Sequence, residues 1–123
     1  MSGGIRIHSD LEIWKRSMQL VFEVYRSTAN FPKHEMFGLV SQMRRASVSA
    51  PSNIAEGAGR QGSGEFVRFL YYASGSLSEL ETQLLISADL GYMNHEESEK
   101  LRAEVVILRK KISATMRSLK RRT

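Results

Sequence analysis

The sequence contains no cysteine and only two prolines among its 123 residues. Without cysteine, a disulfide framework, a thiolate metal site and a thiolate nucleophile are all excluded. No run of about 18 apolar residues is present, and the N-terminal segment carries no apolar stretch typical of a signal peptide. We therefore expect a soluble, cytoplasmic protein that does not enter a membrane.

Catalytic and metal-binding patterns are also missing. His8, His34 and His95 share no ligand spacing, and no Glu-x-x-His pair offers a di-iron site of the kind built into helical bundles. No serine lies in a Gly-x-Ser-x-Gly elbow. Gly-x-Gly-x-x-Gly occurs at residues 57–62, but no strand is expected before it, so it is interpreted as a helix end and turn. These absences favour a non-enzymatic protein without metal or cofactor.

Positive charge is present but unevenly distributed. The chain has 18 lysines and arginines against 13 acids, a net charge of +5. Residues 109–123 contain seven of these basic residues and no acid, so the rest of the chain carries −2. Such a cluster attracts nucleic acid phosphates or another acidic surface. The alternative is a solvated helix end, where cations also interact favourably with the helix dipole.

Apolar residues recur at three- and four-residue spacings along most of the chain, which is typical of amphipathic helices. The pattern predicts four helices, over about residues 10–29, 35–58, 64–90 and 95–120. Because the connections are short, we expect an all-α, antiparallel up-down-up-down four-helix bundle. Residues 1–123 then form one domain, with residues 1–8 flexible and residues 118–123 a frayed basic tail.

Local signals mark the helix starts and the apolar stripes. Ser9 with Glu12, and Asn94 with Glu97, have capping-box spacing, and Ser63 is expected to cap the third helix. The periodic stripe of the first helix comprises Trp14, Met18, Val21, Tyr25 and Thr28. That of the fourth follows a near-heptad pattern, through Leu101, Val105, Leu108, Ile112, Met116 and Leu119.

The second helix, within residues 36–60, has more features than core packing requires. Its core side comprises Met36, Leu39, Val40, Met43, Ala46, Ala50 and Ile54, and the remaining faces are polar or mixed. Pro51 cannot donate a backbone hydrogen bond, which costs about 3 kcal/mol in a helix interior and bends the axis. The bend either shapes a site or curves the helix around its core.

Three further features of the third helix suggest contacts. Glu81 lies at the edge of the apolar stripe, where an acid needs a cationic partner, and Arg44 or Arg45 is the expected one. Gly75 and Ser76 permit close approach by another helix. Tyr71 and Tyr72 either pack at an interface or, if exposed, stack on bases.

The central stretch carries a family resemblance that extends over about residues 10–93. The matching residues are Asp10-Leu11-x-x-Trp14, Phe31-Pro32, Glu35, Gly38-Leu39, Ser41-Gln42-Met43-Arg44-Arg45-Ala46, Ser49-x-Pro51-Ser52-Asn53-Ile54-Ala55-Glu56-Gly57, Arg60, Glu65-Phe66-x-x-Phe69-Leu70 and Ala73-x-Gly75-Ser76-x-x-Glu79-Leu80-Glu81-Thr82-Gln83-Leu84. The stretch resembles the signature of the four-helix bundle family of 23S ribosomal RNA intervening-sequence proteins. Its most diagnostic members are Gln42, Pro51, Asn53, Glu56, Gly57, Glu79 and Glu81.

The resemblance implies a bacterial, cytoplasmic protein that assembles as a homopentamer. A similar bundle is the accessory variability protein of diversity-generating retroelements, a basic pentamer that binds nucleic acid and a reverse transcriptase. We therefore expect an oligomer that binds RNA or DNA, or alternatively a protein-interaction scaffold with no nucleic-acid role. The candidate phosphate-binding residues are Arg44, Arg45, Arg60, Arg109, Lys110, Lys111, Arg117, Lys120, Arg121 and Arg122.

Overall fold

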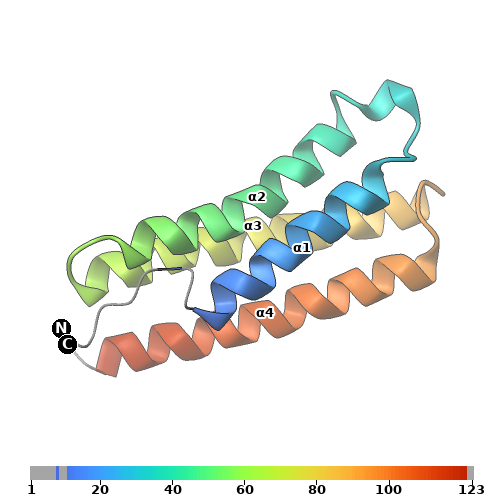
Figure 1. Ribbon diagram of the computed structural model, residues 1–123. Coiled ribbons are helices and arrows are strands. Elements are labelled where there is room, and N and C mark those ends of the chain that lie inside the picture. The colour runs from blue at the N-terminus through green and yellow to red at the C-terminus, as the bar shows by residue number, and fades with distance from the viewer. Residues whose placement is uncertain (1–7, 9–10, 122–123) are drawn as a thin grey trace.

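The computed structural model describes residue 8 and residues 11–121, which form four long helices (Figure 1). Consecutive helices pack side by side, and the first also contacts the fourth, so the predicted up-down-up-down bundle is confirmed. Short connections favour this topology, since a short loop places each helix antiparallel beside the one that precedes it. The helices are α1 (Glu12–Thr28), α2 (Leu39–Ala58), α3 (Ser63–Asp89) and α4 (His95–Arg121), with a 3₁₀ turn at Lys33–Glu35.

The core is a continuous column of aliphatic side chains along the bundle axis. α4 contributes its near-heptad stripe, of which Leu101 to Met116 are buried as predicted. The central side chains have almost no solvent exposure, which is the burial that stabilises a bundle of this size. The largest of them are Met43, Ile54, Leu70, Leu77, Leu80, Leu84, Leu108 and Ile112.

The inward face of α1 differs from the predicted stripe. Val21 and Thr28 are buried, but Tyr25 is exposed and Trp14 and Met18 are only half-buried. The buried stripe is completed by Ile13, Ser17, Leu20 and Val24. Ser17 concealed this register in the sequence, because it is polar yet lies in the core, where its hydroxyl donates to the Trp14 carbonyl at 2.8 Å.

Two of the three predicted helix caps are tested by the structure. Asn94 caps α4, since its Oδ1 accepts the Glu97 amide at 2.7 Å. Ser63 is not a cap: it is the first residue of α3, and Gly62 precedes it with a φ of +87°, which glycine adopts without strain. α1 begins at Glu12, and Ser9 lies outside the described residues.

The start of α2 is held by hydrogen bonds to the Glu35 side chain, which were not predicted from the sequence. α2 begins at Leu39 rather than near residue 35, and Met36 before it is exposed. Glu35 Oε1 accepts the Leu39 amide at 3.1 Å, so Glu35 caps the helix from the preceding turn. Its Oε2 accepts the Tyr92 hydroxyl at 2.9 Å, which ties this turn to the α3–α4 connection.

α2 is one continuous helix on both sides of Pro51, which is buried. The bend at Pro51 stays a prediction. Near the end of α2, a Cβ built on Gly57 would lie 2.8 Å from Phe69 Cβ, so glycine allows α2 and α3 to approach closely. Gly75, by contrast, is exposed with nothing within 4 Å of an added Cβ, so it makes no close helix contact in this chain.

Candidate nucleic-acid interface

The bundle is electrically polarised along its axis. One end comprises residues 11–19, 50–75 and 109–121, where ten basic and three acidic residues give +7. We call it the basic end; it contains the start of α1, the α2–α3 connection and the end of α4 (Figure 1). The acidic end, residues 20–49 and 76–108, has six basic and nine acidic residues, or −3. The positive charge inferred from α4 alone is therefore joined at this end by basic residues of α1, of the α2–α3 connection and of α3.

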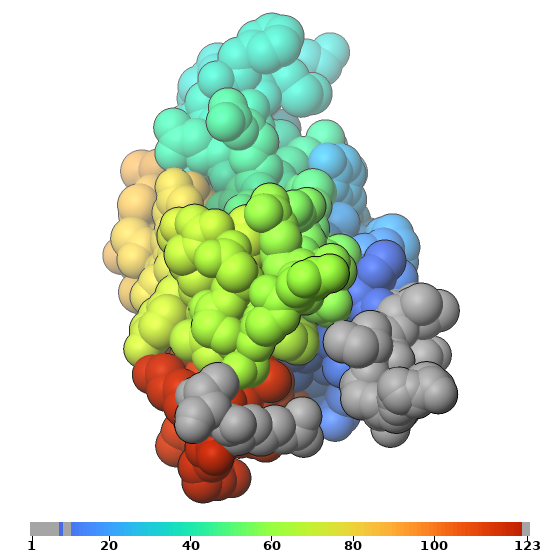
Figure 2. All heavy atoms as spheres, turned by 90° about the vertical axis from the view of Figure 1, so that its left-hand side faces the viewer, coloured from blue at the N-terminus to red at the C-terminus, as the bar shows by residue number. Residues whose placement is uncertain are grey.

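The last two turns of α4 supply the most accessible cations of the basic end. Figure 2 looks onto this end and shows the end of α4 beside the α2–α3 connection and the start of α3. α4 remains helical to Arg121, and Arg117, Lys120 and Arg121 are all exposed. Lys120 Nζ donates to the Tyr71 hydroxyl at 3.0 Å, which links α4 to α3. Arg122 lies outside the described residues.

Arg60, in the α2–α3 connection, and Arg68, near the start of α3, bring further positive charge. Arg60 Nη2 lies 2.7 Å from Glu56 Oε2, and its guanidinium carbon lies 4.9 Å from the centre of the Phe69 ring. Arg68 has the same relation to that ring, also at 4.9 Å. Two arginines therefore lie against one phenylalanine, in contacts typical of cation–π attraction. The sequence analysis missed Arg68; its signal was the Arg68-x-x-x-Tyr72 spacing on the exposed face of a helix.

Hydrogen bonds fix the Arg68 guanidinium in place. It donates to Glu65 Oε1 at 2.8 Å and to the Tyr72 hydroxyl at 2.9 Å. The bond to Glu65, followed by that to Tyr72, raises the pKa of Arg68 above its ordinary value. The same guanidinium lowers the pKa of the Glu65 carboxyl. Arg68 is thus a permanent cation whose position is set before any ligand arrives.

Three other predicted cations lie farther back along α4. Arg109 Nη1 lies 3.6 Å from Glu81 Oε1, so Arg109, and not Arg44 or Arg45, is the partner of Glu81. The sequence could not show this pairing because it depends on how α4 is rotated against α3. Lys111 Nζ lies 3.6 Å from Glu12, and Lys110 is exposed. These residues surround the site and do not form its centre.

Arg44 and Arg45 belong to the acidic end and do not join the other predicted phosphate ligands. Arg44 is anchored to α1: it donates to Thr28 Oγ1 at 3.0 Å and to the Tyr25 carbonyl at 3.3 Å, and it lies 4.4 Å from the centre of the Tyr25 ring. Arg45 is exposed beside the α2–α3 seam. The prediction that these two arginines act together with Arg60 is therefore not supported by their positions.

Two of the signature residues lie at contacts between helices: Gly57 between α2 and α3, and Glu81 between α3 and α4. Asn53 donates to the Ser49 carbonyl at 2.9 Å, and Ser49 Oγ lies 2.8 Å from Ser76 Oγ. Gly57 allows the close contact with Phe69 described above. The remaining signature residues are Pro51, which is buried, Glu56 and Glu81, which pair with Arg60 and Arg109, and Gln42 and Glu79, which are exposed.

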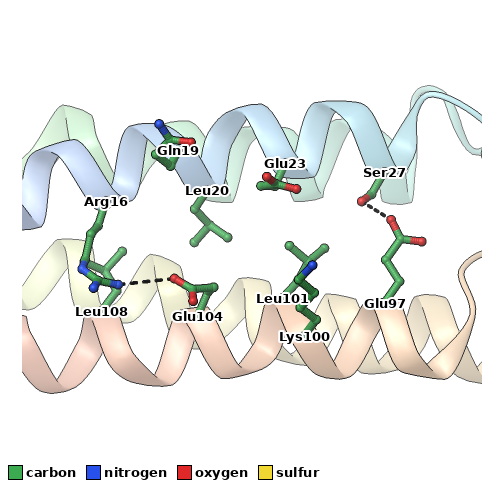
Figure 3. A pocket seen from close by; sticks show the side chains of 10 residues that line it. All are labelled: Arg16, Gln19, Leu20, Glu23, Ser27, Glu97, Lys100, Leu101, Glu104 and Leu108. Carbon is green, nitrogen blue, oxygen red and sulfur yellow. Dashed lines mark hydrogen bonds and ion pairs between the residues drawn. The ribbon is translucent and has the colours of Figure 1, made fainter.

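A groove also runs between α1 and α4 (Figure 3). It encloses about 560 Å³ above Leu20 and Leu101, and its rim carries three acids and two bases. Arg16 bridges to Glu104 at 3.5 Å near one end. Most of its lining belongs to the acidic end, so it is not continuous with the basic patch. Within residues 8 and 11–121, no cluster of histidines and acids suits a metal ion, and no helix is long and apolar enough to cross a bilayer.

These features define an all-α bundle with a cationic, aromatic-lined end. Residues 9–114 match the family described as 23S rRNA-intervening sequence protein, and the chain belongs to this family. The resemblance noted in the sequence is therefore confirmed. No curated protein matches the chain.

The fold is also similar to that of a solved bacterial protein. A protein of unknown function of the S23 ribosomal protein family from Bacteroides thetaiotaomicron VPI-5482 superposes with a TM-score of 0.76 at 20% sequence identity. The match covers 85% of this chain and 97% of that chain. At this level of identity the likeness concerns the fold alone.

Proposed function

We propose that this chain is a non-enzymatic, oligomeric bundle that binds nucleic acid through the basic end. The observation that carries the proposal is the axial separation of charge, +7 against −3, with Arg117, Lys120 and Arg121 exposed at the positive extreme. When lysines and arginines of such a surface bind backbone phosphates, they release the cations condensed on the nucleic acid, so the affinity falls steeply with salt. Because backbone phosphates are the same in every sequence, this binding has little sequence preference.

The salt dependence of binding tests this function. With a fluorescently labelled oligonucleotide, five phosphate contacts give a slope of about −3.5 in a plot of log affinity against log salt for a single strand. Affinity should then fall about 100-fold between roughly 50 and 200 mM salt. No binding at the lower salt concentration, or a flat dependence, contradicts the proposal.

A second candidate function, a protein-interaction scaffold, is favoured by the exposed apolar residues at the acidic end. Phe37 is 96% exposed, and with Tyr25, Met36 and Val48 it lines a groove of about 520 Å³ between α1 and α2. An apolar surface of this kind marks a protein contact. We propose that copies of the chain associate here, with the pentamer of the family resemblance as the expected assembly.

Light scattering measures this association independently of nucleic acid. The expected mass is about five times that of one chain, and Phe37→Ser should shift it toward the monomer because the variant loses the most exposed apolar side chain of the face. Phe22→Ser is a matched control, since Phe22 is also exposed on the surface but does not line the groove. A monomer mass for the unmodified protein would contradict the proposed assembly.

A further inference from the structure

Two tyrosines of the basic end, Tyr71 and Tyr72, are exposed and have cations beside their rings. Tyr71 is 55% exposed and Tyr72 is 47% exposed, on consecutive positions of α3. Each has a cation from a neighbouring side chain beside its ring: Lys120 Nζ lies 5.2 Å from the centre of Tyr71, and the Arg68 guanidinium carbon lies 5.6 Å from the centre of Tyr72. Electrostatic attraction to phosphate alone does not require these rings.

We propose that the basic end is a single-strand site, in which nucleotide bases stack on Tyr71 and Tyr72 while the flanking cations hold the phosphates. The inference rests on the proposed function, since it names the form of nucleic acid that the same site takes. Single-strand binding proteins combine a cationic surface with exposed aromatic rings, and stacking is tolerant of sequence because every base has a π-face. In a duplex the bases are already stacked on one another and their faces are unavailable.

The orientation of the two tyrosines is fixed before a ligand binds. The Tyr71 hydroxyl accepts a hydrogen bond from the Lys120 ammonium, and the Tyr72 hydroxyl accepts one from Arg68 Nη1 at 2.9 Å. The Tyr72 ring also packs edge-to-face on Phe69, with centres 5.4 Å apart and planes at 87°. A ring that is already oriented loses little entropy on binding, which strengthens a stacking contact.

The cations and rings are also close enough to act on one strand. Arg68 contacts both Tyr72 and Phe69, Arg60 contacts Phe69, and Lys120 contacts Tyr71. The two tyrosines therefore lie between Lys120 of α4, which contacts Tyr71, and the pair Arg60 and Arg68, of which Arg68 contacts Tyr72. A strand that crosses α3 between these two groups can place phosphates on both and bases on the rings between them.

Abasic nucleic acid separates stacking from phosphate attraction. We would compare an oligouridylate about ten nucleotides long with an abasic strand of the same length and charge, and with a duplex. The inference predicts that the oligouridylate binds roughly 10- to 100-fold more tightly than the abasic strand, as expected for one or two stacked bases. The duplex should bind more weakly than the oligouridylate at the same salt concentration.

Substitution of the rings assigns the difference to this surface. Tyr71→Leu with Tyr72→Leu should bring the base-to-abasic ratio close to one, because both rings are lost whereas the charge of the surface is not. Tyr71→Phe should keep most of the ratio, because the ring remains. Phe22→Leu is the matched control, since Phe22 is also an exposed aromatic residue but lies at the acidic end and outside the groove proposed for association.

The outcomes distinguish this inference from the function on which it rests. Equal binding of the oligouridylate and the abasic strand, with a steep salt slope, overturns the stacking site and leaves phosphate binding intact. Absence of binding to either strand overturns both. A ratio that survives the double tyrosine substitution places the base contact elsewhere and overturns the site assigned here. Circular dichroism of each variant confirms that the helices are retained.

Discussion

At the acidic end, Tyr92 donates its hydroxyl to Glu35 and packs against the Phe31 ring, with centres 5.5 Å apart. At the basic end, Tyr71 accepts a hydrogen bond from Lys120 and leaves more than half of its surface in solvent. Tyr92 joins the α1–α2 connection to the α3–α4 connection, and so it contributes to the stability of the fold. The hydrogen bond of Tyr71 lies on the surface and contributes less to stability. The comparison teaches that similar polar and aromatic side chains serve stability at one end of this bundle and are available for binding at the other.

The largest expected effect is a loss of nucleic-acid affinity when the charge difference between the two ends is reduced. Replacing Arg117, Lys120 and Arg121 by glutamine should lower nucleic-acid affinity about 100-fold near 50 mM salt and reduce the salt slope by about 2, because three phosphate contacts are lost. Fluorescence anisotropy over a salt series measures both quantities.

The matched control places the same substitutions at the opposite end. Arg26, Lys33 and Lys100 are three exposed cations of the acidic end, and their replacement by glutamine removes equal charge. Affinity should change by less than about 3-fold if binding depends on local phosphate contacts. Equal losses from the two triple variants would show that net charge alone governs binding, against the proposed site.

The next effect concerns the helix contact that positions Phe69. Gly57→Ala introduces a Cβ 2.8 Å from Phe69 Cβ, and the overpacking should destabilise the fold by about 1–2 kcal/mol after the gain in helix propensity. Gly59→Ala is the control, since its Cβ meets nothing closer than 3.6 Å. Urea unfolding should show a lower midpoint for the first variant only; an unchanged midpoint for Gly57→Ala contradicts the packing described.

A smaller effect separates the roles of the two tyrosines. Tyr92→Phe removes the hydroxyl that donates a hydrogen bond to Glu35, and should lower the unfolding free energy by about 1 kcal/mol. Nucleic-acid affinity should not change. Tyr71→Phe should change stability by less than about 0.5 kcal/mol, because its hydroxyl lies on the surface. Thermal unfolding compares the pair; a larger loss of stability in Tyr71→Phe than in Tyr92→Phe would reverse the assignment.

The smallest effect is a pH dependence at the acidic end. Hydrogen bonds from the Leu39 amide, and then from the Tyr92 hydroxyl, lower the pKa of Glu35 from its ordinary value of 4.5. A lowered pKa contributes stability that is fully present above the unfolded value and is lost as pH falls through the folded one. Unfolding free energy should therefore decline below about pH 4.5.

Glu35→Gln tests the origin of this decline. The substitution removes the titrating carboxyl, so the variant should be less stable near neutral pH and should lose less stability on acidification than the unmodified protein. Urea unfolding at pH 7 and near pH 4 gives both values. Parallel pH curves for the two proteins would assign the decline to other carboxyls, such as Glu12 and Glu65, whose pKa values their cationic neighbours also lower.

Much of the fold could be predicted because periodicity reports directly on burial. The stripe of α4 was predicted closely, since it is uninterrupted by polar residues. The stripe of α1 was placed wrongly, because Ser17 is buried and satisfied by a local carbonyl that no periodicity count registers. The interpretation of residues 57–62 as a helix end and turn is confirmed, since α2 ends at Ala58 and α3 begins at Ser63.

Less of the candidate site could be predicted, because it depends on which helix faces meet. The basic end of α4 was visible in the sequence, but its neighbours Arg60 and Arg68 are about fifty residues away in the chain. The rotation of α3 against α4 brings Tyr71 to Lys120 and Glu81 to Arg109, and sequence spacing does not determine this rotation. Arg44 illustrates the converse, since an apparent phosphate ligand is occupied by contacts to α1.

Hydrogen exchange with a bound single strand tests the central claim most directly. We would measure amide protection along the chain with and without an oligouridylate at low salt. The account predicts increased protection at residues 60–72 and 115–121 and no change at residues 31–35 and 90–97. Protection confined to the acidic end, or spread evenly over both ends, would contradict the assignment of binding to the basic end.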